Sequence, residues 1–328
     1  MRTLFVIALL PLLIAATPTG YHVTGEIKIG GEGGWDYLTV DSAARRLYVS
    51  HATHVVVVDL DANKVIGDIP DTPGVHGIAI APELNRGFIS NGRGNNVTIF
   101  DLKTLKATGK AATGENPDSI RYDSVSGRVF AFNGRSKNAT AIDGKSGTVA
   151  ATIALPGKPE FSVADGKGKV YVNIEDTNEI VEIDAAKAVV SKKYSLSPCD
   201  GPSGLAIDAK NRRLFSVCSN RLMAVSDPDA GKVIATPAIG GGSDGAAFDP
   251  GAGYAFSSNG DGTLTIVQQT GGKWDVLENI ATERGARTIA VDEQTHKVYL
   301  SAAKTAPSAG GGRATFLPDT FKVLVVGK

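Results

Sequence analysis

The sequence lacks several features that would place it in a common functional class. It has no excess of charge of either sign, because 34 Lys and Arg residues balance 34 Asp and Glu residues. This neutrality disfavours binding to a nucleic-acid backbone or to an anionic membrane surface. After residue 16 no apolar run approaches the ~20 residues that span a bilayer, and no segment shows the 3.6-residue apolar pattern of a helix. We therefore expect no transmembrane segment in the mature chain.

The N-terminal segment is the exception. Met1 and Arg2 precede a continuous apolar run over residues 4–16, and small or polar residues follow it. This layout is typical of a secretory signal peptide. We expect residues 1–16 to be a signal peptide, the protein to be exported to the periplasm or the extracellular space, and residues 17–328 to form a single domain.

The rest of the chain consists of seven similar units. Each begins with a short, largely apolar run, and we call the last residue of this run the anchor. The anchors are Asp41, Ala81, Asp123, Asp165, Asp208, Asp249 and Asp292. A turn and three further short runs follow, as in RLYVS at residues 46–50 and HVVVV at residues 54–58. Four short strands in ~40 residues match one blade of a β-propeller. The 39 glycines, which show no collagen-like period, belong to the many tight turns of such a fold.

The two ends of the chain complete each other. The seventh unit stops after its third strand, whereas residues 22–30 read as a fourth strand with no unit before it. Pairing the two would complete the seventh blade and remove the exposed sheet edges of an open array. The expected fold is therefore all-β: a seven-bladed β-propeller of four-stranded antiparallel blades, closed by the N-terminal strand.

A resemblance to a known family supports this fold. The units resemble YVTN-type repeats, in which Pro or Gly, a strand, an Asp and a turn precede a segment such as RLYVS or KVYVN. Over residues 21–328 the chain resembles exported bacterial propellers of the YncE-like family, and in architecture alone it resembles propeller lactonases. The resemblance implies the fold and export, but it implies no chemistry, because a fold alone does not assign one.

Equivalent positions of the repeat should converge at one mouth of the central channel, since the first strand of each blade lines that channel. Five residues before the anchors lie the members of what we call the first ring: Asp36, His76, Asp118, Glu160, Ser203, Asp244 and Arg287. Four of the seven are carboxylates. We expect them to form an acidic funnel that binds a ligand or partner.

A second set of positions lies ten residues after the anchors, at the ends of the second strands. This second ring consists of His51, Asn91, Asn133, Ile174, Cys218, Asn259 and Ala302, and Glu175 follows Ile174 in the blade with the shorter first turn. We expect His51, the three Asn residues and Glu175 to face the same funnel and to contribute to ligand binding. Asn before Gly is also a hairpin signal, so these Asn residues have a structural interpretation as well.

These residue types suit a divalent metal ion. Carboxylates and imidazole together can hold Ca²⁺, Mn²⁺ or Zn²⁺, and the candidate ligands are Asp36, His76, Asp118, Glu160 and Asp244. Clustered carboxylates raise one another's pKa, so the candidate catalytic residues are Asp118 and Glu160 as acid or base and His51 and His76 as proton carriers. Arg287 could bind a carboxylate or phosphate group of a ligand.

Two further segments of the sequence carry predictions. Cys199 lies nine residues before the fifth anchor and Cys218 ten after it, so two antiparallel neighbours would bring both to the same face. In an exported protein this placement favours a disulfide over a metal-binding or nucleophilic thiol. The one long insertion, residues 303–318, separates the second and third strands of the seventh unit close to the predicted funnel. It is expected to be a tolerated loop, with a lid as the alternative.

Three functions remain open. The first is an exported, monomeric binding protein without chemistry of its own, whose small-molecule or protein partner docks at the acidic channel mouth. The second is a metal-dependent hydrolase of an ester, lactone or phosphoester that uses the same residues. The third is a purely structural envelope protein, which would need no polar ring. The absence of a contiguous metal motif disfavours the hydrolase, whereas the concentration of ligand-type residues at equivalent positions favours it.

Overall fold

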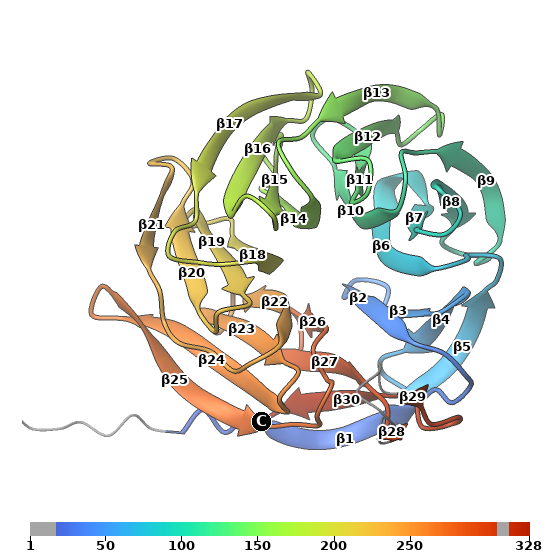
Figure 1. Cartoon of the computed structure of the whole chain (residues 1–328). Helices are drawn as coiled ribbons and strands as arrows, with labels where there is room; N and C mark the ends of the chain where they lie inside the picture. Colours follow the sequence, from blue (N-terminus) through green and yellow to red (C-terminus); the bar gives the residue numbers. More distant parts are fainter. Residues whose placement is uncertain (1–17, 307–314) are drawn as a thin grey trace, which may run out of the picture.

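The structure, a computed structural model, describes residues 18–306 and 315–328. Seven sheets of four antiparallel strands form a ring around a central axis, as Figure 1 shows. The predicted seven-bladed β-propeller is therefore confirmed. The predicted signal peptide, residues 1–16, lies outside the described residues. Within those residues, no helix has the length and apolar character needed to cross a membrane.

The first three blades follow the chain order from the inside of the ring outward. Blade one contains β2 (Trp35–Asp41), β3 (Arg46–His51), β4 (His54–Asp59) and β5 (Lys64–Ile69). Blade two contains β6 (Val75–Ala81), β7 (Arg86–Asn91), β8 (Asn96–Asp101) and β9 (Ala107–Ala112), with the 3₁₀ helix η1 (Pro82–Leu84) after β6. Blade three contains β10 (Pro117–Asp123), β11 (Arg128–Asn133), β12 (Asn138–Asp143) and β13 (Val149–Ala154).

The next three blades repeat this order. Blade four contains β14 (Pro159–Ala164), β15 (Lys169–Ile174), β16 (Glu179–Asp184) and β17 (Val189–Ser195). Blade five contains β18 (Pro202–Asp208), β19 (Arg213–Cys218), β20 (Met223–Asp227) and β21 (Lys232–Ala235). Blade six contains β22 (Ser243–Asp249), β23 (Tyr254–Asn259), β24 (Thr263–Thr270) and β25 (Lys273–Ala281).

Blade seven joins the two ends of the chain. It contains β26 (Ile289–Asp292), β27 (Lys297–Ala302), β30 (Lys322–Gly327) and, as its outer strand, β1 (His22–Lys28). β1 pairs antiparallel with β30, from His22 opposite Gly327 to Lys28 opposite Lys322. The predicted closure of the ring by the N-terminal strand is confirmed.

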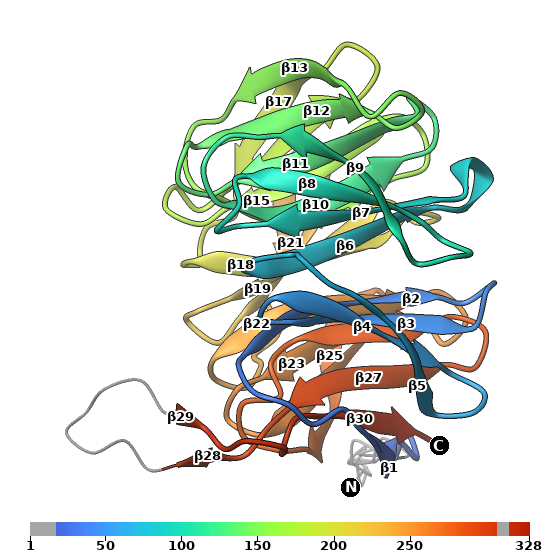
Figure 2. The ribbon, with the colours of Figure 1, turned by 90° about the vertical axis from the view of Figure 1, so that its right-hand side faces the viewer.

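The insertion in blade seven is partly described. β28 (Thr305–Ala306) and β29 (Thr315–Phe316) pair as a short two-stranded ribbon. In Figure 2 this ribbon projects to the left from the edge of the ring. Residues 307–314, the middle of the insertion, lie outside the described residues.

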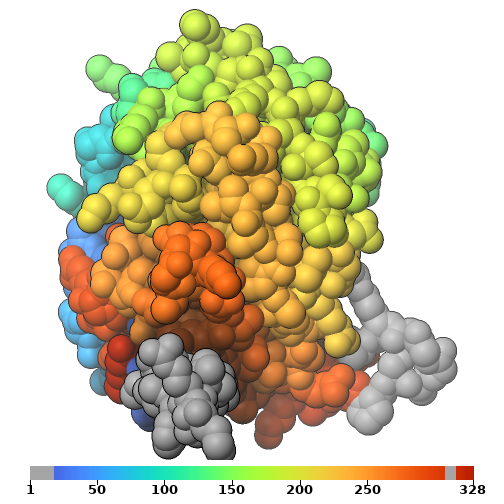
Figure 3. Space-filling view, turned by 90° about the vertical axis from the view of Figure 1, so that its left-hand side faces the viewer, coloured from blue at the N-terminus to red at the C-terminus, as the bar shows by residue number. Residues whose placement is uncertain are grey.

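Apolar side chains packed between neighbouring blades form the core. Each second strand contributes a fully buried aromatic residue at the same position; these are Tyr48, Phe88, Phe130, Tyr171, Phe215, Phe256 and Tyr299. The outer strands form the rim, which Figure 3 shows along β17, β21 and β25 as a continuous surface. Val189, Val190 and Ile234 on that rim are exposed. The repeat thus places its largest apolar groups where blades meet and its fourth strands at the solvent edge.

The anchor carboxylates explain why the first strands end where they do. Asp41, Asp123, Asp165, Asp208, Asp249 and Asp292 are buried, and each accepts a hydrogen bond from a backbone N–H of the turn that follows. Blade two has Ala81 in this place. There the turn is η1 instead, and Pro82 begins it with a φ that suits a first helical position.

Candidate functional site

A bulge near the start of each inner strand carries the first-ring residue in blades one to six. The pairing of β2 with β3 shifts between Trp35 and Leu38, on either side of Asp36, and corresponding shifts occur at the starts of β6, β10, β14, β18 and β22. A bulge leaves residues outside the ladder and re-aims their side chains. The repeated bulge therefore frees the first-ring side chains to point out of the sheet.

Hydrogen bonds from the preceding blade hold the backbone of this ring in place. The Ser90 hydroxyl on β7 donates to the carbonyl of Asp118 in blade three, at 2.6 Å. The Asn173 amide on β15 donates to the carbonyl of Ser203 in blade five, at 2.9 Å. The Ser258 hydroxyl likewise donates to the carbonyl of Arg287. The second strand of one blade thus positions a ring residue of the next.

His76 lies between two carboxylates of neighbouring blades. Its Nδ1 is 2.6 Å from Asp36 Oδ2 and 3.6 Å from Asp118 Oδ1. One ligand atom from each of the three side chains lies within 4.8 Å of the others. A Cβ on Gly92 would come within 2.5 Å of His76 Nε2, so a glycine at position 92 leaves the space that the imidazole occupies. Three of the five predicted metal ligands are therefore brought together.

The three groups shift one another's pKa. Burial opposes charge on His76, but the hydrogen bond to Asp36 and the charges of Asp118 and Glu160 outweigh it and raise the His76 pKa to about 9. Burial raises the pKa of Asp118 to about 6 despite the nearby imidazole. It also raises the pKa of Asp36. The expected mutual effect of like charges is present, but burial is the larger cause.

The remaining carboxylates of the first ring are paired with cations. Lys158 Nζ lies 2.7 Å from Glu160 Oε1 and 2.5 Å from Glu175 Oε2. Asp244 Oδ2 lies 3.1 Å from Nε of Arg287. Glu160 and Asp244, both predicted as metal ligands, therefore lie outside the three-residue group. Burial and the charge of Asp118 raise the pKa of Glu160 to about 8 in spite of Lys158.

The charged residues of the first ring influence one another all the way around the channel axis. The charges of Asp244 in blade six and Arg287 in blade seven act on the pKa of Asp36 in blade one. Asp118 and Lys158 in turn act on the pKa of Asp244, which burial raises. Charged groups from six blades therefore share one mouth. Ser203 completes the ring in blade five, where its hydroxyl donates to the carbonyl of Ser243.

The three second-ring Asn residues do not open onto this mouth. Asn91, Asn133 and Asn259 are fully buried. Each side-chain amide donates to the third strand of its own blade, as Asn91 Nδ2 does to Asn96 Oδ1 and Thr98 Oγ1 at 2.7 and 2.8 Å. Their expected place on the funnel surface is therefore corrected. The amides fasten the hairpin between the second and third strands, because a buried amide must satisfy its donors.

His51 is also buried, away from solvent. Its ring stacks on Phe321 with centroids 4.7 Å apart, and its Nδ1 lies 3.1 Å from His54 Nε2. Burial and the neighbouring His54 lower its pKa to about 4. Glu175 alone of the second-ring neighbours joins the charged mouth, through Lys158.

Two aromatic residues that the sequence analysis missed close the channel next to the first ring. The rings of Tyr37 in blade one and Phe161 in blade four approach to 4.1 Å between centroids. They occupy the position four residues before the anchor, where the other blades have Gly, Ser or Thr. This contrast within the repeat is the signal that could have identified them. Lys158 was also missed, since its role depends on the loop before β14.

The predicted disulfide is present. Cys199 and Cys218 are bonded, with their Cα atoms 5.5 Å apart. The bond ties the loop that enters β18 to the end of β19. Both sulfurs are buried, so neither cysteine contributes a free thiol to the ring.

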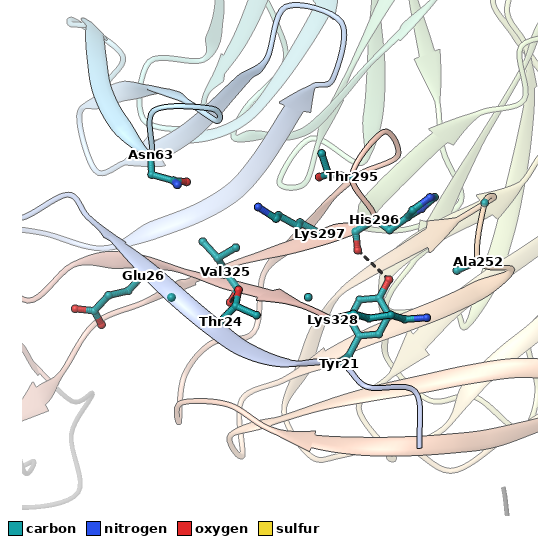
Figure 4. Close-up of a pocket in the computed structure, with 13 residues that line it drawn as sticks. Tyr21, Thr24, Glu26, Asn63, Ala252, Thr295, His296, Lys297, Val325 and Lys328 are labelled. Atoms are coloured by element: carbon teal, nitrogen blue, oxygen red, sulfur yellow. Dashed lines mark hydrogen bonds between the residues drawn. The ribbon is translucent and has the colours of Figure 1, made fainter. Parts of the chain in front are cut away.

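A separate cavity of about 640 Å³ lies at the seam where β1 and β30 close the propeller, and Figure 4 shows its lining. The Tyr21 hydroxyl donates to the carbonyl of His296 there, at 2.8 Å. His296 belongs to the turn after β26, at the opposite end of that strand from the ring position. The seam cavity is thus distinct from the charged mouth.

Comparisons with known proteins support the fold and no specific activity. No family profile matches the chain, and no curated protein sequence matches it. Among solved structures the chain is similar to one titled Kuenenia stuttgartiensis hydrazine synthase. The TM-score is 0.71 at 14% identity, over 86% of this chain and 96% of the other. At that identity the likeness shows a common propeller fold alone.

Proposed function

We propose that this protein is an exported, YncE-like binding protein whose site is the charged first ring, and that a divalent metal ion held by Asp36, His76 and Asp118 is part of that site. The observation that carries the proposal is the placement of His76 Nδ1 between two carboxylates of adjacent blades. Two carboxylate oxygens and an imidazole nitrogen at these separations form a three-ligand set that leaves coordination positions free.

The donor set favours Mn²⁺ or Zn²⁺ over Ca²⁺. An imidazole ligand suits transition metals, whereas Ca²⁺ takes six to eight oxygens. Fewer oxygens are on offer here, since Lys158 and Arg287 engage Glu160 and Asp244. The free positions on the ion would face the channel mouth, where a ligand or partner docks.

The cations of the ring indicate an anionic group on that ligand. Arg287 is half exposed and turns Nε toward Asp244, and its Nη groups make no hydrogen bond to a described residue. A carboxylate or phosphate on the ligand would bridge the metal ion and Arg287. This supports binding as the main role of the ring.

Hydrolysis by the same residues is less well supported. His76 would be a metal ligand, and His51 lies under Phe321, so neither histidine is free to carry a proton to a substrate. We therefore favour binding without turnover.

Metal titration tests the proposal. Chelator-treated protein is titrated with MnCl₂, and binding is followed by calorimetry and by the melting temperature. We expect one equivalent of Mn²⁺ to bind and to raise the melting temperature, and Asp118→Asn to weaken binding at least tenfold. Asp244→Asn is the matched control, because Asp244 is a ring carboxylate outside the three-residue group. Equal affinity in wild type and Asp118→Asn, or no binding at millimolar Mn²⁺, would refute the metal site.

A further inference from the structure

The central channel contains a positive charge that the first ring does not use. A cavity of about 250 Å³ lies in the channel and is lined by inner-strand residues of all seven blades. Arg121 on β10 is the one basic residue among those that line it. The same side chain borders a second cavity of about 380 Å³, lined by Pro82, Glu83 and residues 122–124 around the turn after β10.

The repeat makes this arginine exceptional. The position two residues before the anchor holds, in blade order, Thr39, Ala79, Arg121, Val163, Ala206, Ala247 and Ala290. Four blades have alanine here, and no other blade has a charged or long side chain. The fold therefore does not require an arginine at this position.

The hydrogen bond between blades three and four does not require the charge of Arg121 either. Arg121 donates from Nε and Nη2 to the Ser162 carbonyl of blade four, at 3.0 and 2.7 Å. At the equivalent position the Thr39 hydroxyl donates to the Ile78 carbonyl of blade two, at 2.7 Å. A hydroxyl thus makes the same bridge. The Nη1 group of Arg121 makes no hydrogen bond to any residue that the structure describes.

No carboxylate balances the guanidinium. Within the described parts of the chain, no carboxylate oxygen lies within 4.0 Å of Arg121. Glu293 lines the same cavity, but the charges that act on its pKa are those of Asp249 and Asp292. Burial lowers the pKa of Arg121, yet an arginine remains charged in proteins. Arg121 is partly buried and faces the channel cavity. A partly desolvated charge without a counter-charge is costly, so an ion of opposite sign from the solvent is expected beside it.

We propose that the channel binds a small monovalent anion of the halide class, chloride or bromide, at Arg121 Nη1. Ile78, Ile120 and Phe248 are among the apolar residues that line the cavity. Such a lining cannot replace the hydration of phosphate or sulfate, whereas a halide gives up water more easily. The paired rings of Tyr37 and Phe161 come between the first ring and Arg121 along the inner strands, so the anion site is separate from the metal site.

Chloride NMR tests the proposal directly. Exchange with a protein site broadens the ³⁵Cl resonance, and bromide should reverse the broadening by competition. We expect broadening with the wild type and with Arg121→Lys, and its loss in Arg121→Thr, which retains a hydroxyl as in blade one. Arg86→Gln is the matched control, because Arg86 also donates to carbonyls of the next blade but does not line the channel. Equal broadening by the wild type and Arg121→Thr would overturn the proposal.

A second measurement does not depend on the folding of a variant. Crystals of the wild-type protein grown in sodium bromide should show an anomalous peak within hydrogen-bonding reach of Arg121 Nη1. A channel without bromide at Arg121, in crystals that bind bromide elsewhere, would also overturn the proposal.

Discussion

The Tyr37 ring packs against Phe161 across the channel, with the two ring planes tilted by 32°, and its hydroxyl donates to Asp118 Oδ1 at 3.3 Å. Blades one, three and four are thus joined at a single point beside the metal-binding group. The aromatic pair also separates the charged mouth from the part of the cavity that Arg121 lines. Two sites of opposite charge can therefore coexist along one axis.

The first prediction concerns this junction. Tyr37→Phe retains the aromatic ring but removes the donor to Asp118, so the free energy of unfolding should fall by about 1 kcal/mol. Tyr37→Ala also removes the partly buried ring and should cost about 3 kcal/mol in total. Urea unfolding of the two variants measures the contribution of the hydroxyl and that of the ring. A Tyr37→Phe protein as stable as wild type would show that the hydroxyl contributes nothing to the junction.

The second prediction concerns pH and His51. The unfolded chain binds a proton at this histidine near pH 6.5, but burial lowers the folded pKa to about 4. The neutral side chain therefore contributes stability above pH 6.5, and this contribution is lost as the pH falls toward 4. The loss amounts to roughly 3 kcal/mol at most.

Substitution separates this effect from other titrations. The stability of His51→Gln relative to wild type should improve steadily from pH 6.5 to 4, as measured by urea unfolding at each pH. His22→Gln is the control, because His22 is exposed on β1, and its curve should run parallel to that of wild type. If His51→Gln also runs parallel to wild type, the burial of His51 has no energetic consequence.

The propeller and its closure could be predicted from sequence because the repeat fixes which positions are equivalent. The first ring followed from the same equivalence, since one bulge recurs in six blades. The second ring did not, because strand position alone does not reveal which face a side chain takes. Asn91 turns into its own blade, where Thr98 on the next strand accepts its amide, and that pairing requires the hairpin register.

The contacts of charged residues in loops could not be predicted from the sequence either. Lys158 precedes β14 by one residue, and its contact with Glu175 depends on how the loop before β14 meets the turn after β15. The sequence shows Arg121 at a repeat position where four other blades have alanine. Its lack of a carboxylate partner required the structure.

The third prediction concerns the disulfide. The bond joins residues 19 positions apart, and a closed loop of similar length stabilises a protein by about 3 kcal/mol. Cys199→Ala/Cys218→Ala should therefore lower the free energy of unfolding by that amount while retaining Mn²⁺ binding. Urea unfolding and metal titration of the double variant measure the two effects. Two alkylatable thiols in unreduced, exported protein would contradict the bond itself.

The fourth prediction concerns the junction between blade one and blade seven, where one arginine contacts two carboxylates. Arg45 Nη1 lies 2.6 Å from Asp292 Oδ2, whose side chain is fully buried in blade seven. Its Nε lies 2.9 Å from Asp61 Oδ1, whose side chain is 67% exposed. Asp292 also accepts hydrogen bonds from Gln294 N and Thr295 Oγ1, so it holds both the ion pair and its own turn.

Removing Asp292 should therefore lower the free energy of unfolding much more than removing Asp61. Asp292→Ala breaks a buried pair and removes acceptors from two donors, so we expect a loss of about 3–5 kcal/mol. Asp61→Ala breaks an ion pair in water and should cost less than about 1 kcal/mol. Chemical unfolding of both variants, together with Asp61→Ala/Asp292→Ala, tests this difference. Equal losses from the two single variants would mean that the buried ion pair with Asp292 contributes no more to this junction than the exposed pair with Asp61.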